Sequence, residues 1–157
     1  MRKRLIKQNI EPHPSRQRNW LNLDSLTEVE LTSEDTAYPI EAALIAGSDQ
    51  GWRAAQPGAQ TIRLIFNQPQ HIQHIRLLFI EENHERTQQF TLRWSGDGAQ
   101  TYQEITRQQY NFNPADTTRE VEEYQVELDG VTTLELNIIP DISGSDAIAS
   151  LEQLQLA

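Results

Sequence analysis

The sequence contains no cysteine among its 157 residues. This absence excludes disulfide bonds, thiol nucleophiles and thiolate metal sites, and it is compatible with a reducing compartment. Long apolar runs are also missing. The segment Met1–Lys7 begins with basic residues but offers few apolar ones, far short of the apolar core of a secretory signal, and no segment reaches transmembrane length. We therefore expect a soluble, cytoplasmic protein.

Lysine is nearly absent, and positive charge is concentrated at the start of the chain. No lysine follows Lys7, and 13 basic residues stand against 23 acidic ones, for a net charge of −10. The first 20 residues hold six of the basic residues and one acid. We interpret residues 1–20 as a basic arm, flexible in the simplest interpretation, ahead of one acidic domain at 21–157. Because nucleic acids and anionic membranes bind through Lys and Arg, we expect neither as a partner of the acidic domain.

A sustained helical pattern is missing as well. No segment keeps apolar residues at i, i+3, i+4 and i+7 over three turns, although residues 20–26 are compatible with one short helical turn. Apolar and polar residues alternate instead, which is typical of strands with one buried face. The clearest alternating sets are Ile62, Leu64 and Phe66; Phe90, Leu92 and Trp94; and Leu134, Leu136 and Ile138.

This alternation predicts strands at residues 61–66, 72–80, 88–95, 102–108, 121–128, 133–139 and 150–156. Frequent short strands separated by turns predict an all-β fold, a two-sheet antiparallel β-sandwich. If the strands run back and forth, their connections alternate between two ends of the molecule. Short turns then share one end, at 67–71, 96–101 and 129–132, and longer loops share the other, at 47–60, 81–87, 109–120 and 140–149.

Four motifs follow one another in a recognisable order. Residues 40–54 read Ile-Glu-Ala-Ala-Leu-Ile-Ala-Gly-Ser-Asp-Gln-Gly-Trp-Arg-Ala, followed by Gln-Thr-Ile-Arg-Leu-Ile-Phe at 60–66. Phe-Thr-Leu-Arg-Trp-Ser-Gly-Asp-Gly at 90–98 and Ala-Ser-Leu-Glu-Gln-Leu at 149–154 complete the series. The series resembles discoidin-like domains, which include coagulation-factor type-C modules and have a galactose-binding-like fold. The resemblance covers roughly residues 33–157 and implies a discoidin-like jelly roll with a binding activity.

The resemblance also implies a calcium site, but two of its usual positions are changed. Ala46 stands at the position of the usual aspartate ligand and Gln153 at that of the usual glutamate, with Glu152 one residue out of phase. Calcium prefers several charged oxygen ligands, so we predict no tight calcium site there and no cofactor. His71 and His74 do not form a metal site either, because residues three apart on a strand point to opposite faces.

Motifs for catalysis are missing too. The chain has no Gly-x-Ser-x-Gly elbow, no P-loop and no His-Glu-x-x-His, and its four histidines are scattered. Its many carboxylates leave open a pair suited to glycoside hydrolysis, although nothing marks one pair above the others. We therefore predict a protein that is not an enzyme, and a hydrolase is the most remote alternative.

The longer loops carry the side chains best suited to recognition. Sugars are bound by aromatic rings and by planar hydrogen-bonding groups, and these loops provide both. Trp52 is expected to plug the end of the sandwich, and one of the Tyr110 and Phe112 pair is expected in the core. Arg86 and Arg119 have an alternative structural role as partners of loop carboxylates. The candidate ligand-binding residues are His84, Arg86, Tyr110, Asn111, Phe112 and Arg119.

These residues favour a binding module that takes carbohydrate through loops at one end of the sandwich. Sugar-binding discoidin-like domains use comparable loops, and the parallel rests on residue type and loop alone. An intracellular protein–protein interaction module is the alternative, because the same loops or an edge strand can hold a protein partner. The sequence determines neither the ligand nor the oligomeric state.

Overall fold

The computed structural model describes residues 19–157, so the basic arm proposed for residues 1–20 lies almost entirely outside the described residues. Strands dominate the described part, and no helix within it is long and apolar enough to cross a membrane. The elements are α2 (Leu23–Leu26), β1 (Thr27–Leu31), α3 (Glu41–Leu44), β2 (Trp52–Arg53), β3 (Gln60–Ile80), β4 (Arg86–Ser95), β5 (Gln103–Phe112), β6 (Arg119–Ile139), β7 (Ser150–Leu151) and β8 (Gln153–Leu156).

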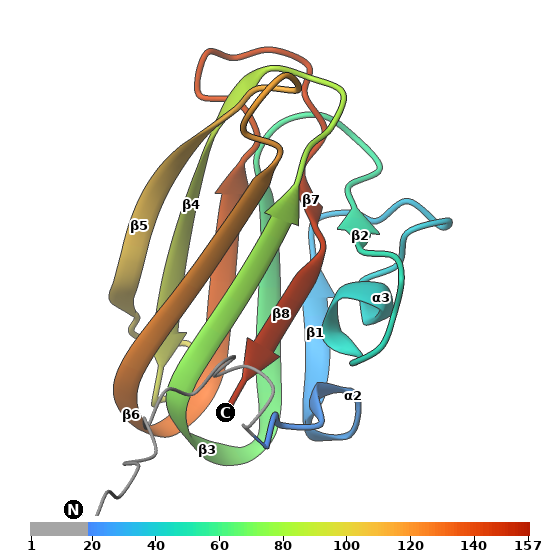
Figure 1. The fold of residues 1–157 in the computed structure, drawn as a ribbon. Helices are drawn as coiled ribbons and strands as arrows, with labels where there is room; N and C mark the ends of the chain where they lie inside the picture. The colour runs from blue at the N-terminus through green and yellow to red at the C-terminus, as the bar shows by residue number, and fades with distance from the viewer. Residues whose placement is uncertain (1–18) are drawn as a thin grey trace, which may run out of the picture.

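Two long strands, β3 and β6, pass through both layers of the fold. They pair antiparallel from Gln60 opposite Ile138 to Ile80 opposite Arg119. Figure 1 shows both strands running down one layer, bending at the bottom and returning up the other. The first layer has the order β1–β3–β6–β4–β5, and the second combines the other halves of β3 and β6 with β8 beside β3. The predicted two-sheet antiparallel β-sandwich is confirmed.

Alternating side chains from the two layers build the core between them. Every residue of the three clearest alternating sets is buried except Trp94, which is half-buried against the same core. Each large apolar side chain that is fully buried stabilises the fold by about 1.5–3 kcal/mol. Trp52 is 0% exposed, and its indole N–H donates to the backbone oxygen of Ser33 at 3.1 Å. The prediction that Trp52 plugs the sandwich is confirmed.

The bends and strand ends differ in detail from the prediction. The segment 67–71 was expected to be a turn between two strands, but β3 continues through it, and Gln70 lies opposite Val131 between two shifts of register. The expected closing strand at 150–156 is divided at Glu152 into β7, which pairs with β2, and β8, which pairs with β3. The two parts of this segment therefore belong to different sheets.

β5 also continues further than the alternation indicated. It was expected to end at residue 108, but its ladder with β4 runs on to Phe112, which pairs with Arg86. The Thr87 hydroxyl donates to the Asn111 side-chain oxygen at 2.7 Å across this extension. Since polar cross-strand pairs of this kind stabilise a sheet, the strand continues through and beyond the polar run at residues 106–109. The connection between β5 and β6 is therefore shorter than expected, at residues 113–118.

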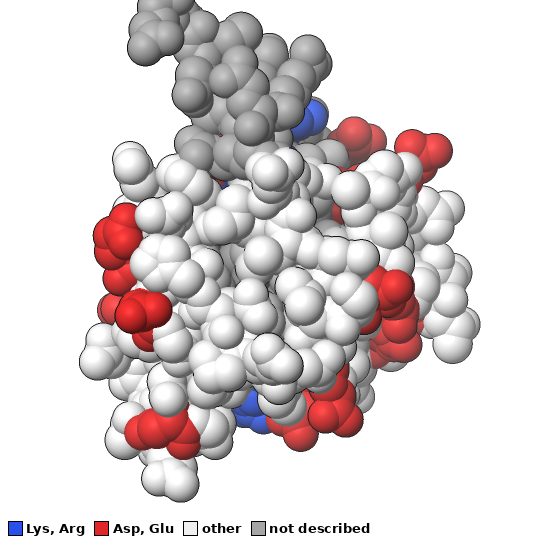
Figure 2. Space-filling model, turned by 90° about the horizontal axis from the view of Figure 1, so that it is seen from below, with Lys and Arg blue, Asp and Glu red and all other residues white. Residues whose placement is uncertain are grey.

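The connections lie at two ends of the sandwich, as predicted. The bends of β3 and β6 and the turn between β4 and β5 lie at the bottom, and the longer loops meet at the top (Figure 1). At the bottom, the Gly98 N–H donates to the Thr132 hydroxyl at 3.0 Å and joins two of the turns. Figure 2 shows this end from below, largely uncharged in its middle, with acidic side chains toward the rim.

Candidate functional site

A cleft of about 910 Å³ opens at the end of the sandwich where the longer loops meet. Segments 49–55, 80–86 and 141–152, together with the turn at Asp35 and Tyr38, line it. The Arg53 guanidinium lies over the Tyr38 ring at 4.4 Å from its centroid, which gives this wall one aromatic and one planar cationic group. Asn83 and His84 stand exposed on the 81–85 loop. The cleft therefore brings hydrogen-bonding groups together from distant parts of the chain.

Arg86 forms a rigid part of the cleft lining and is 3% exposed. Its Nε donates to a Glu81 carboxylate oxygen at 2.9 Å, and its Nη1 donates to the backbone oxygen of Pro140 at 2.8 Å. Its guanidinium also lies over the Phe112 ring, 4.7 Å from the centroid. Two connections between strands and the end of β5 are thus tied to one cation. The Nη2 of Arg86 has no hydrogen-bond partner among the described residues.

The pKa of Glu81 is set by both its burial and its hydrogen-bond partners. Burial raises the pKa of this carboxyl group, but the hydrogen bonds from Arg86 and from the Asn83 N–H lower it more, so the pKa lies below its ordinary value of 4.5. Glu81 is therefore a carboxylate at neutral pH. It forms a fixed ion pair with Arg86 rather than a free group in the cleft.

A chain of polar groups leads from Arg86 into the space between the layers. Gln88 accepts from Arg86 Nη1 at 3.2 Å and donates to Glu120 at 3.2 Å. Glu120 is 2% exposed, and its burial, together with a hydrogen bond and the charge of the neighbouring Glu122, raises its pKa to about 8. The Tyr124 hydroxyl donates to Glu122 at 3.0 Å. Glu120 is therefore a neutral acid at pH 7.

The loop at 140–149 is held in shape by Asp141. This carboxylate accepts from the Ser145 hydroxyl at 2.6 Å, and from the Ser143 hydroxyl at 2.7 Å and the Ser143 N–H at 3.0 Å. Those hydrogen bonds, that of Ser145 first, lower the pKa of Asp141 to about 2. Asp141 is therefore occupied in its own loop, which forms one wall of the cleft.

The electrostatic character of the cleft is strongly negative. Eight carboxylates and two guanidiniums line it, with His84 as the one imidazole. Some of these acids have fixed partners, as Glu81 and Asp141 do. Among residues 19–157, no hydrogen bond or ion pair engages the carboxylates of the remaining acids on the 47–51, 81–85 and 140–152 segments, which are Asp49, Glu82, Glu85, Asp146 and Glu152.

The structure brings two of the six predicted ligand-binding residues into the cleft. His84 is exposed on its wall and Arg86 is buried in its lining. The others do not line it. The extension of β5 moves Tyr110, Asn111 and Phe112 onto the sheet, and Arg119 is the exposed first residue of β6. Phe112 is 0% exposed in the core, which confirms that one member of its pair with Tyr110 is core and corrects its assignment to a ligand-binding surface.

Tyr110 and Asn111 make hydrogen bonds on the β5–β6 side of the molecule, whereas no carboxylate partner of the Arg119 guanidinium is found among the described residues. The Tyr110 ring packs edge-on against Phe112 at 5.0 Å, and its hydroxyl donates to the backbone oxygen of Arg119 at 2.8 Å. Asn111 accepts from Thr87, as described above. The alternative structural role for Arg86, as the partner of a loop carboxylate, is confirmed in kind, and that carboxylate is Glu81 rather than the expected Glu82, Glu85, Asp116 or Glu120.

Several lining residues were not identified from the sequence. Tyr38 lies before the first motif, in a turn closed by a bridge between Asp35 and Tyr38, and no periodic pattern marks that segment. Asn83, Asp49, Glu82, Glu85 and Asp146 sit on loops that were expected to carry the site, so their loops were foreseen but not their role, whereas Glu152 lies in the segment predicted as a strand at 150–156. The density of acids in 81–85, Glu-Glu-Asn-His-Glu, was the available signal.

The residues present do not fit the calcium site that the resemblance implies. Ala46 supplies no side-chain ligand, and the Gln153 side-chain oxygen accepts from Arg76 Nη1 at 2.9 Å, so a cationic group already lies against it. Glu152 points elsewhere, with an oxygen close to the backbone of Gly51. Within the described residues, no group of three or more His, Asp or Glu side chains could hold a metal ion.

No family model and no curated protein matches the sequence. Solved structures do match the fold. The family 32 CBM from C. perfringens NanJ, in complex with galactose, has a TM-score of 0.63 at 12% identity, covering 87% of this chain and 96% of its own. A pectin binding carbohydrate binding module has a TM-score of 0.62 at 13% identity, covering 83% and 89%. Chitosan-binding module 1 from a Paenibacillus sp. IK-5 chitosanase/glucanase has a TM-score of 0.60 at 14% identity, covering 87% and 98%.

These similarities define the class of fold. The chain has a discoidin-like, galactose-binding-like β-sandwich, and the resemblance found in its motifs is confirmed at the level of the fold. The similarity in fold extends over most of each of these carbohydrate-binding modules.

Proposed function

We propose that this chain is a non-enzymatic carbohydrate-binding module that takes its ligand in the loop-end cleft. One observation carries the proposal. Loops from separate parts of the chain enclose a single cleft of about 910 Å³ at the end of a sandwich whose fold recurs in modules that bind galactose, pectin and chitosan. Sites of this kind are concave and carry a few convergent polar groups.

The chemistry of the cleft suits a sugar. Tyr38 offers an aromatic ring, and Asn83 and His84 offer planar donors and acceptors for hydroxyl groups. Free carboxylates accept hydrogen bonds from sugar hydroxyls as well. Arg86 and Asp141 hold the 81–85 and 140–149 loops in place, which reduces the ordering that binding would otherwise require.

The test combines a glycan array with calorimetric titration of the best glycan. His84→Ala and Asn83→Ala are expected to weaken binding at least about tenfold, or about 1.4 kcal/mol each. Their melting temperatures should stay within a few degrees of wild type, because both side chains are exposed. Asn111→Ala is the matched control, since Asn111 is an exposed loop-proximal amide that does not line the cleft.

Two results would contradict the proposal. Equal losses in Asn111→Ala and in the cleft variants would place the site on the β5–β6 side, where the sequence had placed most of it. Failure of every glycan to bind, combined with specific capture of a protein partner that His84→Ala abolishes, would establish the interaction module in its place.

A further inference from the structure

Glu120 lies at the inner end of the chain of polar groups that begins at Arg86. The Gln88 amide donates to one of its carboxylate oxygens at 3.2 Å, and no donor within residues 19–157 reaches the other oxygen. Both Glu120 and Gln88 are buried. The carboxyl group is therefore shielded from bulk water, and a negative charge on it is costly.

The groups that face Glu120 from its own strand and from β3 favour its neutral form. Burial comes first in raising its pKa, and the hydrogen bond and charge of Glu122, two residues along the same face of β6, raise it further. The Tyr124 hydroxyl, on the same face, donates to Glu122. Directly opposite on β3, Phe79 is buried and apolar. The cation that acts on Glu120 is Arg86 of β4, one amide group away.

Arg86 connects this interior carboxyl group to the wall of the cleft. Its Nη1 donates both to Gln88 at 3.2 Å and to the backbone oxygen of Pro140 at 2.8 Å. Its Nε donates to Glu81 at 2.9 Å, and its Nη2 has no acceptor in the described part of the chain. One buried guanidinium thus divides its donors between the interior and the two cleft loops that follow Glu81 and Pro140.

The other titratable groups around this chain have different contacts. The Tyr110 hydroxyl of β5 donates to a backbone oxygen of β6 at 2.8 Å. His84, on the 81–85 loop, acts through its charge on Glu81. Among the residues that the structure describes, neither forms a hydrogen bond with Glu120 or Arg86. A change in the charge of Glu120 therefore acts first on Gln88 and Arg86.

We propose that Glu120 is a buried pH switch, and that loss of its proton weakens the hold of Arg86 on the wall of the cleft. An ionised Glu120 attracts the guanidinium, and each donor that turns inward leaves Glu81 or the Pro140 carbonyl without its partner. The 81–85 and 140–149 loops then lose a contact that fixes them. The cleft keeps its shape at acid and neutral pH, and its wall loosens at alkaline pH.

The pH range of the change follows from the raised pKa of Glu120, about 8. A single group titrates over about one unit on either side of its pKa, so the wall should loosen between roughly pH 7 and pH 9. The inference goes beyond the proposed function, because it concerns the protein without a ligand and holds for any ligand of the cleft.

An NMR titration of the isotope-labelled full chain from pH 6 to 9.5 tests the switch. The Arg86 Nε–H signal is assigned through its proximity to the Phe112 ring, since the guanidinium lies 4.7 Å from the ring centroid. This signal should shift and broaden with the same midpoint, near pH 8, as the signal of the Glu120 carboxyl carbon. In Glu120→Gln, which keeps the size of the side chain but cannot ionise, the Arg86 signal should not move.

A backbone amide reports on the second loop. The Ile142 N–H donates to the Thr87 oxygen at 2.9 Å and fixes the start of the 140–149 loop on β4. After correction for the intrinsic effect of pH, its exchange with water should rise at least about tenfold across the titration in wild type, because local opening becomes easier. The rise should be absent in Glu120→Gln.

Glu123→Gln is the matched control. Glu123 lies on the same strand, is exposed, and pairs with Arg76 rather than with Arg86. Its substitution removes the same charge outside the polar chain, so both signals should behave as in wild type.

Three results would overturn the switch. The first is a Glu120 carboxyl carbon that does not titrate between pH 6 and 9.5, and the second is one that titrates while the Arg86 signal stays in place. The third is an Arg86 signal that moves equally in Glu120→Gln, because the cause is then the alkaline pH acting on the whole domain. If Glu120→Gln does not fold, agreement or disagreement of the two midpoints in wild type still decides. These readouts need no glycan, so their failure leaves the proposed function untouched.

Discussion

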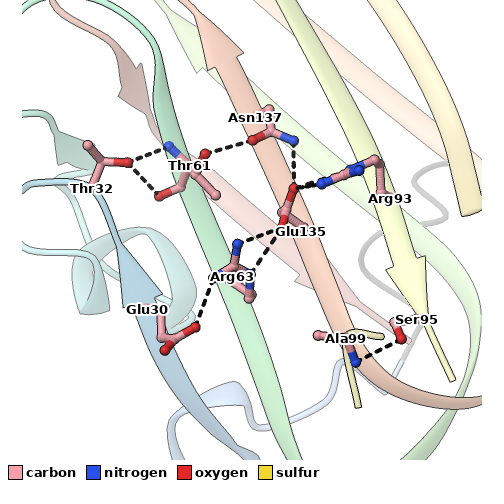
Figure 3. A network of polar contacts seen from close by, with 9 residues as sticks. All are labelled: Glu30, Thr32, Thr61, Arg63, Arg93, Ser95, Ala99, Glu135 and Asn137. Atoms are coloured by element: carbon pink, nitrogen blue, oxygen red, sulfur yellow. Dashed lines mark hydrogen bonds and ion pairs between the residues drawn. The ribbon is translucent and has the colours of Figure 1, made fainter. Parts of the chain in front are cut away.

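Charged side chains are arranged in opposite ways on the outer face of the first layer and in the loop-end cleft. On the sheet face, Glu135 is 1% exposed and accepts from Arg63 at 2.9 Å, from Asn137 at 2.8 Å and from Arg93 (Figure 3). Arg63 in turn donates to Glu30 at 2.9 Å. In the cleft, five carboxylates have no such partner among the described residues. The same acidic chain therefore pairs its acids on this sheet face and leaves five of them without a partner in the cleft.

The pKa of Glu135 shows how complete the pairing is. Burial raises the pKa of this carboxyl group, but hydrogen bonds from Arg93, Asn137 and Arg63 lower it more, so it lies below the ordinary value of 4.5. A carboxyl group whose pKa is lower in the folded state than in the unfolded state stabilises the folded state above pH 4.5. This stability is lost as the pH falls through the folded-state pKa. The sheet-face network therefore stabilises the first layer at neutral pH.

The largest loss of stability is expected at Arg86. This side chain is buried, as in the sheet-face network, but it lies in the lining of the cleft. Arg86→Ala should cost about 3–5 kcal/mol of unfolding free energy, because it leaves the Glu81 carboxylate without its partner in a mostly buried place. Urea unfolding measures this loss. A loss below about 1 kcal/mol would show that Arg86 is a ligand-binding group, as the sequence suggested, rather than a structural one.

A smaller loss is expected on the sheet face. Glu135→Ala leaves Arg63 and Arg93 without their shared carboxylate, but their side chains are 33% and 38% exposed, so water compensates in part. We expect a loss of about 2 kcal/mol. Glycan affinity, measured at a temperature where the variant is folded, should not change. Weaker glycan binding in this variant would contradict the assignment of a structural role to the sheet face and a binding role to the cleft.

The pH dependence of stability tests the polar chain behind Arg86. The folded pKa of Glu120, about 8, lies above its ordinary value of 4.5, so the folded state holds more protons between these values. Stability from Glu120 is therefore full below pH 4.5 and is lost as the pH rises toward 8. Melting temperatures from pH 5 to 9 should fall in wild type and fall less in Glu120→Gln. Parallel curves would contradict a neutral Glu120 in the folded protein.

The smallest effect on stability is expected from substituting two comparable loop aspartates, Asp97 and Asp141, which lie at opposite ends of the sandwich. Asp97, in the bottom turn, accepts from Thr101 and Ser95, and these hydrogen bonds lower its pKa to about 2, as in Asp141. Asp97→Asn and Asp141→Asn should therefore lower the melting temperature by similar small amounts. Only Asp141→Asn should weaken glycan binding, since its loop lines the cleft. Equal binding in the two variants would move the site away from the 140–149 loop.

Much of the fold was predictable because burial on one face leaves a period of two. Ile62, Leu64 and Phe66 show it without interruption, and the turns between such segments place the loops at two ends. The end of β5 was missed because residues 106–109 are all polar and separate Tyr110 and Phe112 from the apolar residue Ile105 earlier in the strand.

The site was predicted less well, because it depends on contacts between distant segments. That Arg86 would be buried against Glu81 follows from the fold of the 81–85 loop, and loop conformation is not encoded in periodicity. Tyr38 reaches the cleft from a segment without strand alternation. His84 was identified because exposed loop residues at the correct end follow from strand order alone. The cytoplasmic location and the basic arm at residues 1–20 stay predictions.

The bent pair of β3 and β6 has a consequence for how the chain reaches its structure. Ile80 and Arg119 enclose the shortest chain segment between the two strands, and Gln60 and Ile138 enclose the longest. The entropy lost on closing a loop increases with its length, so β3 and β6 pair most easily beside Ile80. Their pairing must then extend residue by residue through the bend into the other layer. Both layers are therefore completed by one late, non-local event, and we expect slow folding in which neither layer is stable before the other.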